Sequence, residues 1–513
     1  MSDYTVNNKR ILINTLFLYV RMILIMCVNL LVVKELLRIL GASDYGLYNV
    51  VGGVVSMFAF LNNALASASQ RYISYELAKN ENNSLNQVYS SLVIVYIGLC
   101  LAILLLGETF GYWFVSFKLD YDSSRSAAVF WVYQFSLFSL IITVFSSCYN
   151  AVIIAYEKMK IYAYISIFEA LLKLIIIYLL IKSPLDKIVS YAFLLLLVNI
   201  IITLIYRLLS RRYCSQSVFH FYWDSKLLKE LISFSGWNLF GSISGVLRSQ
   251  GINILLNVFF GTLVNAARGI SYQVYGAIHN FSNNFITAVK PQLIKSYSVG
   301  DKQGLYTLLY LSTKASFFLL FFLSVPVMLN LRFLLDLWLT TYPDETKLFT
   351  ELVLVNLLIE SISNPLMVLA QATGNVKKYQ IVVGIVLLLN VPVSYLLFKI
   401  GCPSYACFIA MIVISLFALI SRLQVLKEIA NLNIFEYAKK VLVRVLIVVV
   451  LVSLISISVL FVKDLYTQLS FFLLSTFISM TSIVLFSFFF GLETQERRAI
   501  SNIIKNKKFY YQI

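Results

Sequence analysis

Five basic side chains lie within or at the ends of long apolar runs, where a charge is expensive. Arg21, Arg248 and Lys314 lie well inside their runs, whereas Arg38 and Arg268 lie near the outer ends. A permanent charge inside a membrane span usually faces a cavity or a partner rather than lipid, and arginine can hold phosphate oxygens through two parallel hydrogen bonds. These residues therefore predict contact with an anionic substrate. The alternative is that each one pairs with a carboxylate or a helix C-terminus, or reaches the membrane interface, and has a structural role.

Two carboxylates in the apolar runs are candidates for ion coupling. Glu169 lies four residues before Lys173, so both share one helix face and an internal ion pair is the alternative. Glu360 is isolated, with a structural hydrogen bond near the helix kink at Pro365 as its alternative. We expect coupling to H⁺ or Na⁺ through these carboxylates and no other cofactor.

Amide side chains are the third group of candidates. An amide in a span seeks a partner or a wet cavity. The candidates for cavity-lining positions are Asn14, Gln70, Asn238, Gln250, Asn253 and Asn257. Most of them fall in the glycine-rich stretch 233–284, so the sequence predicts that function is concentrated in the first two apolar runs and in this stretch.

The composition is that of a polytopic membrane protein. Of the 513 residues, 60% are hydrophobic and 13% are charged, against about 25% charged in an ordinary soluble protein. The net charge of +17 could indicate nucleic acid, but in a membrane protein the position of the charges matters more, and no nucleic-acid partner is expected. The six scattered cysteines lack metal-ligand spacing, and no phosphate-binding glycine loop is present. We therefore expect no metal site, no ATP hydrolysis and no enzyme activity.

Apolar runs of about 20 residues predict an all-α fold with about fourteen transmembrane helices. The expected spans are 11–33, 48–67, 88–107, 127–155, 161–182, 188–209, 232–260, 264–289, 306–330, 350–373, 379–400, 403–424, 441–462 and 466–490. With both termini in the cytoplasm, 26 of the 41 Lys and Arg residues fall on the inner side and 11 on the outer side, as the positive-inside rule requires. The expected domains are a six-helix lobe 1–210, a cytoplasmic connector 211–230, a second lobe 231–426, and accessory helices with a tail in 427–513.

A weak internal repeat supports the two lobes. Leu40-Gly41 precedes the second span and Phe260-Gly261 precedes the eighth, and Ala, Gln, Ser and Tyr recur at the same offsets in 66–75 and 288–297. Both copies leave the membrane on the inner side, so the repeat is parallel. Parallel halves with a site between them near mid-membrane are a known transporter plan.

Several stretches resemble polysaccharide-biosynthesis flippases of the O-antigen and capsule type (Wzx-like). They are Asn14–Met22, Asp44–Val55, Gln70–Tyr72, Gly236–Gly241, Gln250–Asn257 and Asn265–Ile270. That group belongs to the MOP superfamily, with the multidrug and toxin extrusion (MATE) transporters and the lipid II flippases. The resemblance implies two six-helix lobes in a V that open alternately to each side, in the inner membrane of a bacterium.

The resemblance also implies a substrate and roles for arginines. The substrate would be an undecaprenyl-diphosphate-linked oligosaccharide, an anionic glycolipid moved from the cytoplasmic to the periplasmic leaflet for O-antigen, capsule or exopolysaccharide synthesis. Arg21 matches a first-span arginine and Arg268 an eighth-span arginine that contact the lipid diphosphate in related flippases, while Arg38 matches more loosely. Membrane lipids and other polysaccharide assembly proteins are the implied partners.

Two other functions were weighed against this one. An ion-coupled multidrug antiporter of the MATE type needs buried carboxylates for a cationic drug, whereas spans one, seven and eight carry arginine here. A polymerase or ligase of the same pathway needs large outer loops with catalytic residues. The outer loops expected here are short, and 108–126 is among the longest.

Overall fold

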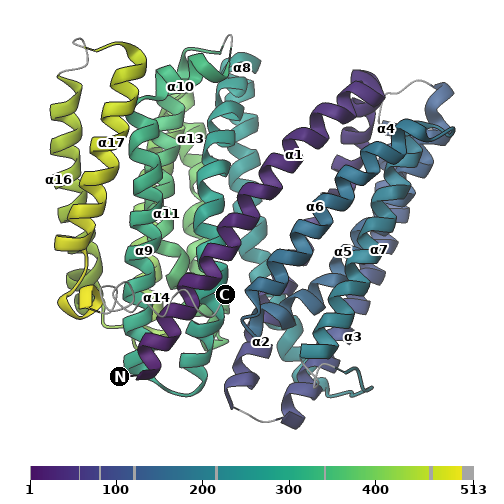
Figure 1. Cartoon of the computed structure of the whole chain (residues 1–513), viewed down its shortest axis with the longest axis horizontal. Coiled ribbons are helices and arrows are strands. Elements are labelled where there is room, and N and C mark those ends of the chain that lie inside the picture. Colours follow the sequence, from purple (N-terminus) through teal and green to yellow (C-terminus); the bar gives the residue numbers. More distant parts are fainter. Residues whose placement is uncertain are drawn as a thin grey trace. The chain divides into compact units, whose positions relative to one another are not determined.

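A computed structural model describes residues 2–56, 58–79, 82–118, 123–213, 218–339, 342–461 and 466–498, and nearly all of these are helical (Figure 1). The α-helices are α1 (Ser2–Ser56), α2 (Ala59–Lys79), α3 (Asn82–Leu106), α4 (Tyr112–Lys118), α5 (Ser126–Ala155), α6 (Met159–Lys182), α7 (Lys187–Tyr213), α8 (Ser225–Ser298), α9 (Lys302–Leu329), α10 (Leu331–Trp338), α11 (Glu345–Thr373), α12 (Lys377–Leu388), α13 (Asn390–Lys399), α14 (Ala406–Ala430), α15 (Ile434–Tyr437), α16 (Val443–Leu460) and α17 (Gln468–Phe486). Short π-helical segments lie at η1 (Gly107–Gly111), η3 (Ala438–Leu442) and η5 (Ser487–Gly491), and a 3-10 turn lies at η2 (Ser123–Arg125).

The expected all-α membrane fold is confirmed. Ten helices in the described part of the chain are long and apolar enough to cross a membrane, and they coincide with the expected spans three to six and nine to fourteen. The other four expected spans lie in α1, α2 and α8, which are helical but richer in polar residues. The chain is a multi-pass membrane protein, and the full count of fourteen spans stays a prediction.

The two longest helices are broken at matching glycines. Gly41 in α1 has φ 77° and ψ 168°, and Gly261 in α8 has φ 81° and ψ −174°. This backbone region is open almost only to glycine, so the side-chain-free residue permits the break. These are the two glycines that the sequence repeat aligns, and the same conformation therefore recurs in both halves.

The first copy of the repeat differs from the second beyond this break. After Gly261 helix α8 continues to Ser298, whereas the chain after Gly41 is interrupted again between α1 and α2. There the Phe58 N–H donates to the Val55 carbonyl at 3.1 Å, and the Leu61 N–H to the Phe58 carbonyl at 3.2 Å. These tight turns divide the span expected over 48–67.

The expected outer loop 108–126 was too long. The helix does not end at 107, because the chain continues through the π-helical η1 into α4 and is helical up to Lys118. The Gly107 carbonyl accepts the backbone N–H of Tyr112 in the π turn and also the Tyr133 hydroxyl at 2.6 Å. The Tyr133 side chain on α5 therefore stabilises this helical extension. The extension was not predicted because the polar residue Glu108 ends the apolar run at 107.

The chain forms two compact units. The N-terminal unit is Leu12–Leu239, and the C-terminal unit is Phe240–Ile513 together with Met1–Ile11. In the N-terminal unit α5 packs on α7 and α2. In the C-terminal unit α11 packs between α9 and α14, and the pair α16–α17, yellow in Figure 1, lies beside α9. The division falls inside α8, so the connector 211–230 goes with the N-terminal unit.

Candidate functional site

A polar cavity of about 280 Å³ lies inside the N-terminal unit, between α1, α5, α6 and α7. We call it the Arg21 cavity. Its lining residues are Arg21, Ile25, Asn29, Thr143, Ser146, Ser147, Asn150, Tyr162, Ser166, Glu169, Ala170, Lys173, Asn199, Ile202, Thr203 and Tyr206. It brings together two predicted site residues, Arg21 and Glu169.

Helical spacing explains why these side chains share a cavity. Residues three or four apart lie on one face of a helix. The lining residues of α5 are 143, 146, 147 and 150, and those of α7 are 199, 202, 203 and 206, which is one stripe per helix. Neither stripe was predicted from the sequence. The signal was present as the spacing of Ser, Thr and Asn in otherwise apolar runs.

Three charged side chains line the cavity, and two of them neutralise each other, which leaves the positive charge of Arg21. The Arg21 guanidinium lies 4.3 Å from the centre of the Tyr162 ring, and its Nε has no hydrogen-bond partner. Among the described residues, none forms an ion pair with Arg21. Glu169 accepts a hydrogen bond from Lys173 at 2.7 Å, which is the intrahelical pair that the sequence left as the alternative. With that pair neutral, Arg21 gives the cavity a net positive charge.

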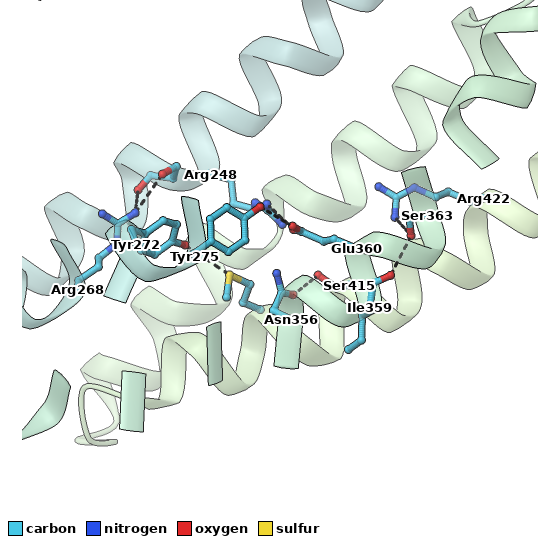
Figure 2. A network of polar contacts seen from close by, with 12 residues as sticks. Arg248, Arg268, Tyr272, Tyr275, Asn356, Ile359, Glu360, Ser363, Ser415 and Arg422 are labelled. Atoms are coloured by element: carbon cyan, nitrogen blue, oxygen red, sulfur yellow. Dashed lines mark hydrogen bonds and ion pairs between the residues drawn. The ribbon is translucent and has the colours of Figure 1, made fainter. Parts of the chain in front are cut away.

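A second cluster lies in the C-terminal unit and joins α8 to α11 (Figure 2). The Arg248 guanidinium donates to Glu360 Oε1 at 3.0 Å, and the Tyr275 hydroxyl donates to Glu360 Oε2 at 2.9 Å. The His279 ring stacks on Tyr275 with 5.1 Å between ring centres. Both charged side chains are about four-fifths buried, so Arg248 and Glu360 neutralise each other. The ion pair between Arg248 and Glu360 brings two predicted site residues together, whereas Tyr275 and His279 were not predicted.

Arg268 lies in the same cluster but uses its donors differently. It donates to Asn253 Oδ1 at 3.1 Å, to the Ser249 carbonyl at 2.9 Å and to the Ser249 hydroxyl at 3.0 Å. Its guanidinium also lies 4.3 Å from the centre of the Tyr272 ring (Figure 2). Arg268 is thus held beside Arg248 by neutral acceptors across the Gly261 break and keeps its positive charge.

Two predicted cations belong to neither cluster. Lys314 is fully buried and forms an ion pair with Glu496 at 2.6 Å. The Arg38 side chain is 81% exposed and lies 3.7 Å from Glu35. Both arrangements match the structural alternative, in which a carboxylate holds the cation.

The remaining predicted amides are dispersed. Asn14 is buried and donates to the Glu157 carbonyl at the turn between α5 and α6. Asn238 is buried and donates to the Phe234 carbonyl of its own helix at 2.9 Å. Gln70 is half-buried, and the other two, Gln250 and Asn257, are exposed. Of the six amides, Asn253 contacts a predicted cation, Arg268.

Comparison with known proteins gives the family and the fold. The sequence profile of the family described as polysaccharide biosynthesis protein matches residues 11–297, which is more than half of the chain. No curated protein matches the chain. Structural similarity extends to a multidrug resistance MATE family transporter of the MOP superfamily in its outward-facing conformation (TM-score 0.71, 15% identity, 83% of this chain and 96% of that one).

Two further solved structures show the same fold. One is a MATE transporter in complex with MaD3S (TM-score 0.69, 15% identity, 83% of this chain and 96% of that one). The other is a MOP superfamily transporter from Pyrococcus furiosus, described as having a binding pocket of reverse polarity (TM-score 0.68, 14% identity, 81% of this chain and 95% of that one). At these identities the likeness shows the fold alone, and that fold is one of transporters.

Proposed function

Because the chain belongs to the polysaccharide biosynthesis protein family, we propose that it is a flippase for an undecaprenyl-diphosphate-linked oligosaccharide. It moves this glycolipid from the cytoplasmic to the periplasmic leaflet of a bacterial inner membrane, by alternating access and without enzymatic chemistry. Both termini are cytoplasmic in this proposal. The glycan then enters O-antigen, capsule or exopolysaccharide synthesis, together with other assembly proteins.

The observation that supports this proposal is that Arg21 lies in a polar cavity and forms no ion pair with the described part of the chain. Its guanidinium lies over the Tyr162 ring, and its Nε–H, which has no hydrogen-bond partner among the described residues, is available to an incoming anion. A diphosphate oxygen there would gain charge-assisted hydrogen bonds without first displacing a carboxylate. A cationic drug would instead meet a net positive charge, which disfavours the antiporter alternative.

The second cluster contains the other arginines of the proposal. Arg268 keeps its charge and is held in a fixed orientation, which makes it a candidate for anion contact in the C-terminal unit. Arg248 can join only after Glu360 is released, and Glu360 is then the candidate for H⁺ or Na⁺ coupling. Glu169 is the weaker candidate because Lys173 already neutralises it. Lys314 and Arg38 are left out of the proposed site.

Complementation of a strain that lacks its own flippase tests the function. The parent chain should restore surface glycan, and Arg21→Ala should restore at least tenfold less, because a hydrogen bond to a charged group contributes about 1.5–3 kcal/mol. Arg207→Ala is the matched control, since Arg207 lies on α7 in the same unit but is exposed and does not line the cavity. Expression of each variant is checked by blot.

The outcomes separate the two functions. Restored glycan with no change in a drug-susceptibility panel supports the flippase. Drug resistance without restored glycan would refute it in favour of an antiporter. Equal glycan from the parent and a well-expressed Arg21→Ala variant would remove Arg21 from the site.

A further inference from the structure

The lining of the Arg21 cavity is rich in hydrogen-bond acceptors. Four of the hydroxyls that line it donate to the backbone carbonyl one helical turn earlier, at 2.7–3.1 Å, so their O–H donor is already used within their own helix. The four residues are Thr143, Ser147, Ser166 and Thr203. A hydroxyl used in this way keeps acceptor capacity for a ligand, although Ser147 already uses part of it to accept the Asn62 side-chain amide at 2.9 Å.

Two further acceptors point to the same kind of ligand. The Asn150 side-chain oxygen is buried and has no hydrogen-bond partner among the residues that the structure describes. Glu169 accepts from Lys173 through Oε1 and, as an ionised carboxylate, has acceptor sites beyond that bond. A ligand that satisfies this lining must donate several hydrogen bonds from a small volume, and a sugar ring with its hydroxyl groups does this.

Charge and size narrow the ligand further. Because Glu169 and Lys173 pair, Arg21 is the lining residue whose positive charge is not neutralised, and a matching ligand carries one anionic group in addition to its hydroxyl donors. The volume of about 280 Å³ lies at the lower end of small-molecule sites, which are roughly 300–1,000 Å³. The cavity therefore fits one ring with one charged group, and an oligosaccharide would have to extend out of it.

We propose that the Arg21 cavity is the subsite for the first sugar of the glycolipid, the ring bonded directly to the diphosphate. This inference rests on the proposed function and adds a specificity site to it. Arg21 holds a phosphate oxygen adjoining the ring, and the acceptors of α5, α6 and α7 receive the hydroxyl hydrogens of the ring. The polar stripes of these helices would then select the first sugar, while the rest of the glycan stays outside the cavity.

Ligand-observed saturation-transfer NMR on the full chain in nanodiscs tests this directly. The probes are a panel of hexose 1-phosphates and N-acetylhexosamine 1-phosphates, with inorganic phosphate, neutral hexose and a hexuronate as comparators. We expect at least one sugar 1-phosphate to bind more tightly than every comparator. Arg21→Met should weaken that binding about tenfold to a hundredfold, the loss of a hydrogen bond to a charged group. Arg207→Met, at an exposed arginine of the same unit, should leave it unchanged.

A second variant separates the ring from the phosphate. The double variant Thr143→Val and Thr203→Val removes two hydroxyls at nearly constant shape. It should weaken binding of the sugar 1-phosphate and leave binding of inorganic phosphate unchanged. Equal weakening of both ligands would refute a ring subsite.

The other outcomes also decide the matter. Equal binding of sugar 1-phosphates and inorganic phosphate would overturn the inference, because the cavity would then hold only an anion. Tighter binding of hexuronate would overturn it in favour of an acidic sugar elsewhere in the glycan. If no sugar 1-phosphate binds to a parent chain that does restore surface glycan, the subsite fails and the flippase proposal stands. A parent chain that restores no glycan refutes the proposed function itself.

Discussion

The buried ion pair between Lys314 and Glu496 should dominate the attachment of the C-terminal segment to α9. Lys314 is fully buried, Glu496 is 7% exposed, and their charged atoms lie 2.6 Å apart. Glu496 also accepts the Glu493 N–H at 2.7 Å, which fixes the carboxylate. Removing one partner leaves the other charge buried and uncompensated, at a cost of about 3–5 kcal/mol, whereas replacing both by apolar residues is often neutral.

Three variants measure this coupling. Lys314→Met and Glu496→Leu should each lower the midpoint of thermal unfolding of the C-terminal unit by about 6–12 °C, taking 3 kcal/mol and about 2–4 °C per kcal/mol. The double variant should return close to the parent. The readout is thiol labelling in detergent, resolved by mass spectrometry. Cys407 is buried in the C-terminal unit and reports the loss, whereas Cys148 is buried in the N-terminal unit and serves as the internal reference.

An exposed pair in the same unit is the matched control. The Lys347 side chain is 55% exposed and lies 3.9 Å from Glu351. Such surface pairs contribute about 0–1 kcal/mol, so Lys347→Met should move the Cys407 midpoint by no more than a few degrees. The reasoning is refuted if Lys314→Met behaves like this control, or if the double variant is as unstable as the two single variants combined.

Three glycine substitutions give further tests by the same labelling, with Cys407 as the reporter for Gly261 and Gly491, and with Cys148 as the reporter and Cys407 as the reference for Gly41, which lies in the N-terminal unit. Gly41→Ala and Gly261→Ala should each cost about 1–3 kcal/mol, although an added Cβ meets no atom within 4 Å, because their backbone region is open almost only to glycine. Gly491→Ala should cost about 1–3 kcal/mol for a different reason, since the new Cβ would lie 2.5 Å from the Phe318 ring. Gly276→Ala is the control for all three, because it has open space and ordinary helical φ, and it should be neutral or stabilising. A loss at Gly276 equal to the others would show that the labelling reports general damage.

Hydropathy and length predicted most of the fold. Ten expected spans recur as long apolar helices, because a membrane helix must be continuous and apolar, and both properties are local. The two breaks were visible as Gly41 and Gly261 in the repeat, since their backbone conformation requires glycine. The interruption near Phe58 and the π turn at η1 were not predicted, because mean hydropathy does not report backbone geometry. The first consists of local hydrogen bonds between residues three apart, and the second also accepts a hydrogen bond from the distant Tyr133.

The candidate site was less predictable because pairing joins residues far apart in the chain. A charge in an apolar run predicted Arg21 and Arg248 equally well as substrate-contacting residues. The structure separates them, since Glu360, 112 residues after Arg248, neutralises that arginine, whereas among the described residues no carboxylate pairs with Arg21. The cavity was not predicted, because its lining residues lie in runs whose mean hydropathy is high. Small residues such as Thr143 lower that mean too little to be noticed, and their helical spacing is the informative signal.

This difference between the two arginines predicts a difference in pH response. An anion would reach Arg21 without breaking an ion pair, but it would reach Arg248 only by displacing Glu360, which would then have to take up a proton or a cation because a bare buried carboxylate is costly. Glu360→Gln keeps the shape and removes that charge. Its transport, measured as flipping of the glycolipid in proteoliposomes, should no longer respond to the imposed pH difference, whereas Arg21→Met should lower transport at every pH. An unchanged pH response in Glu360→Gln would show that coupling does not run through this pair.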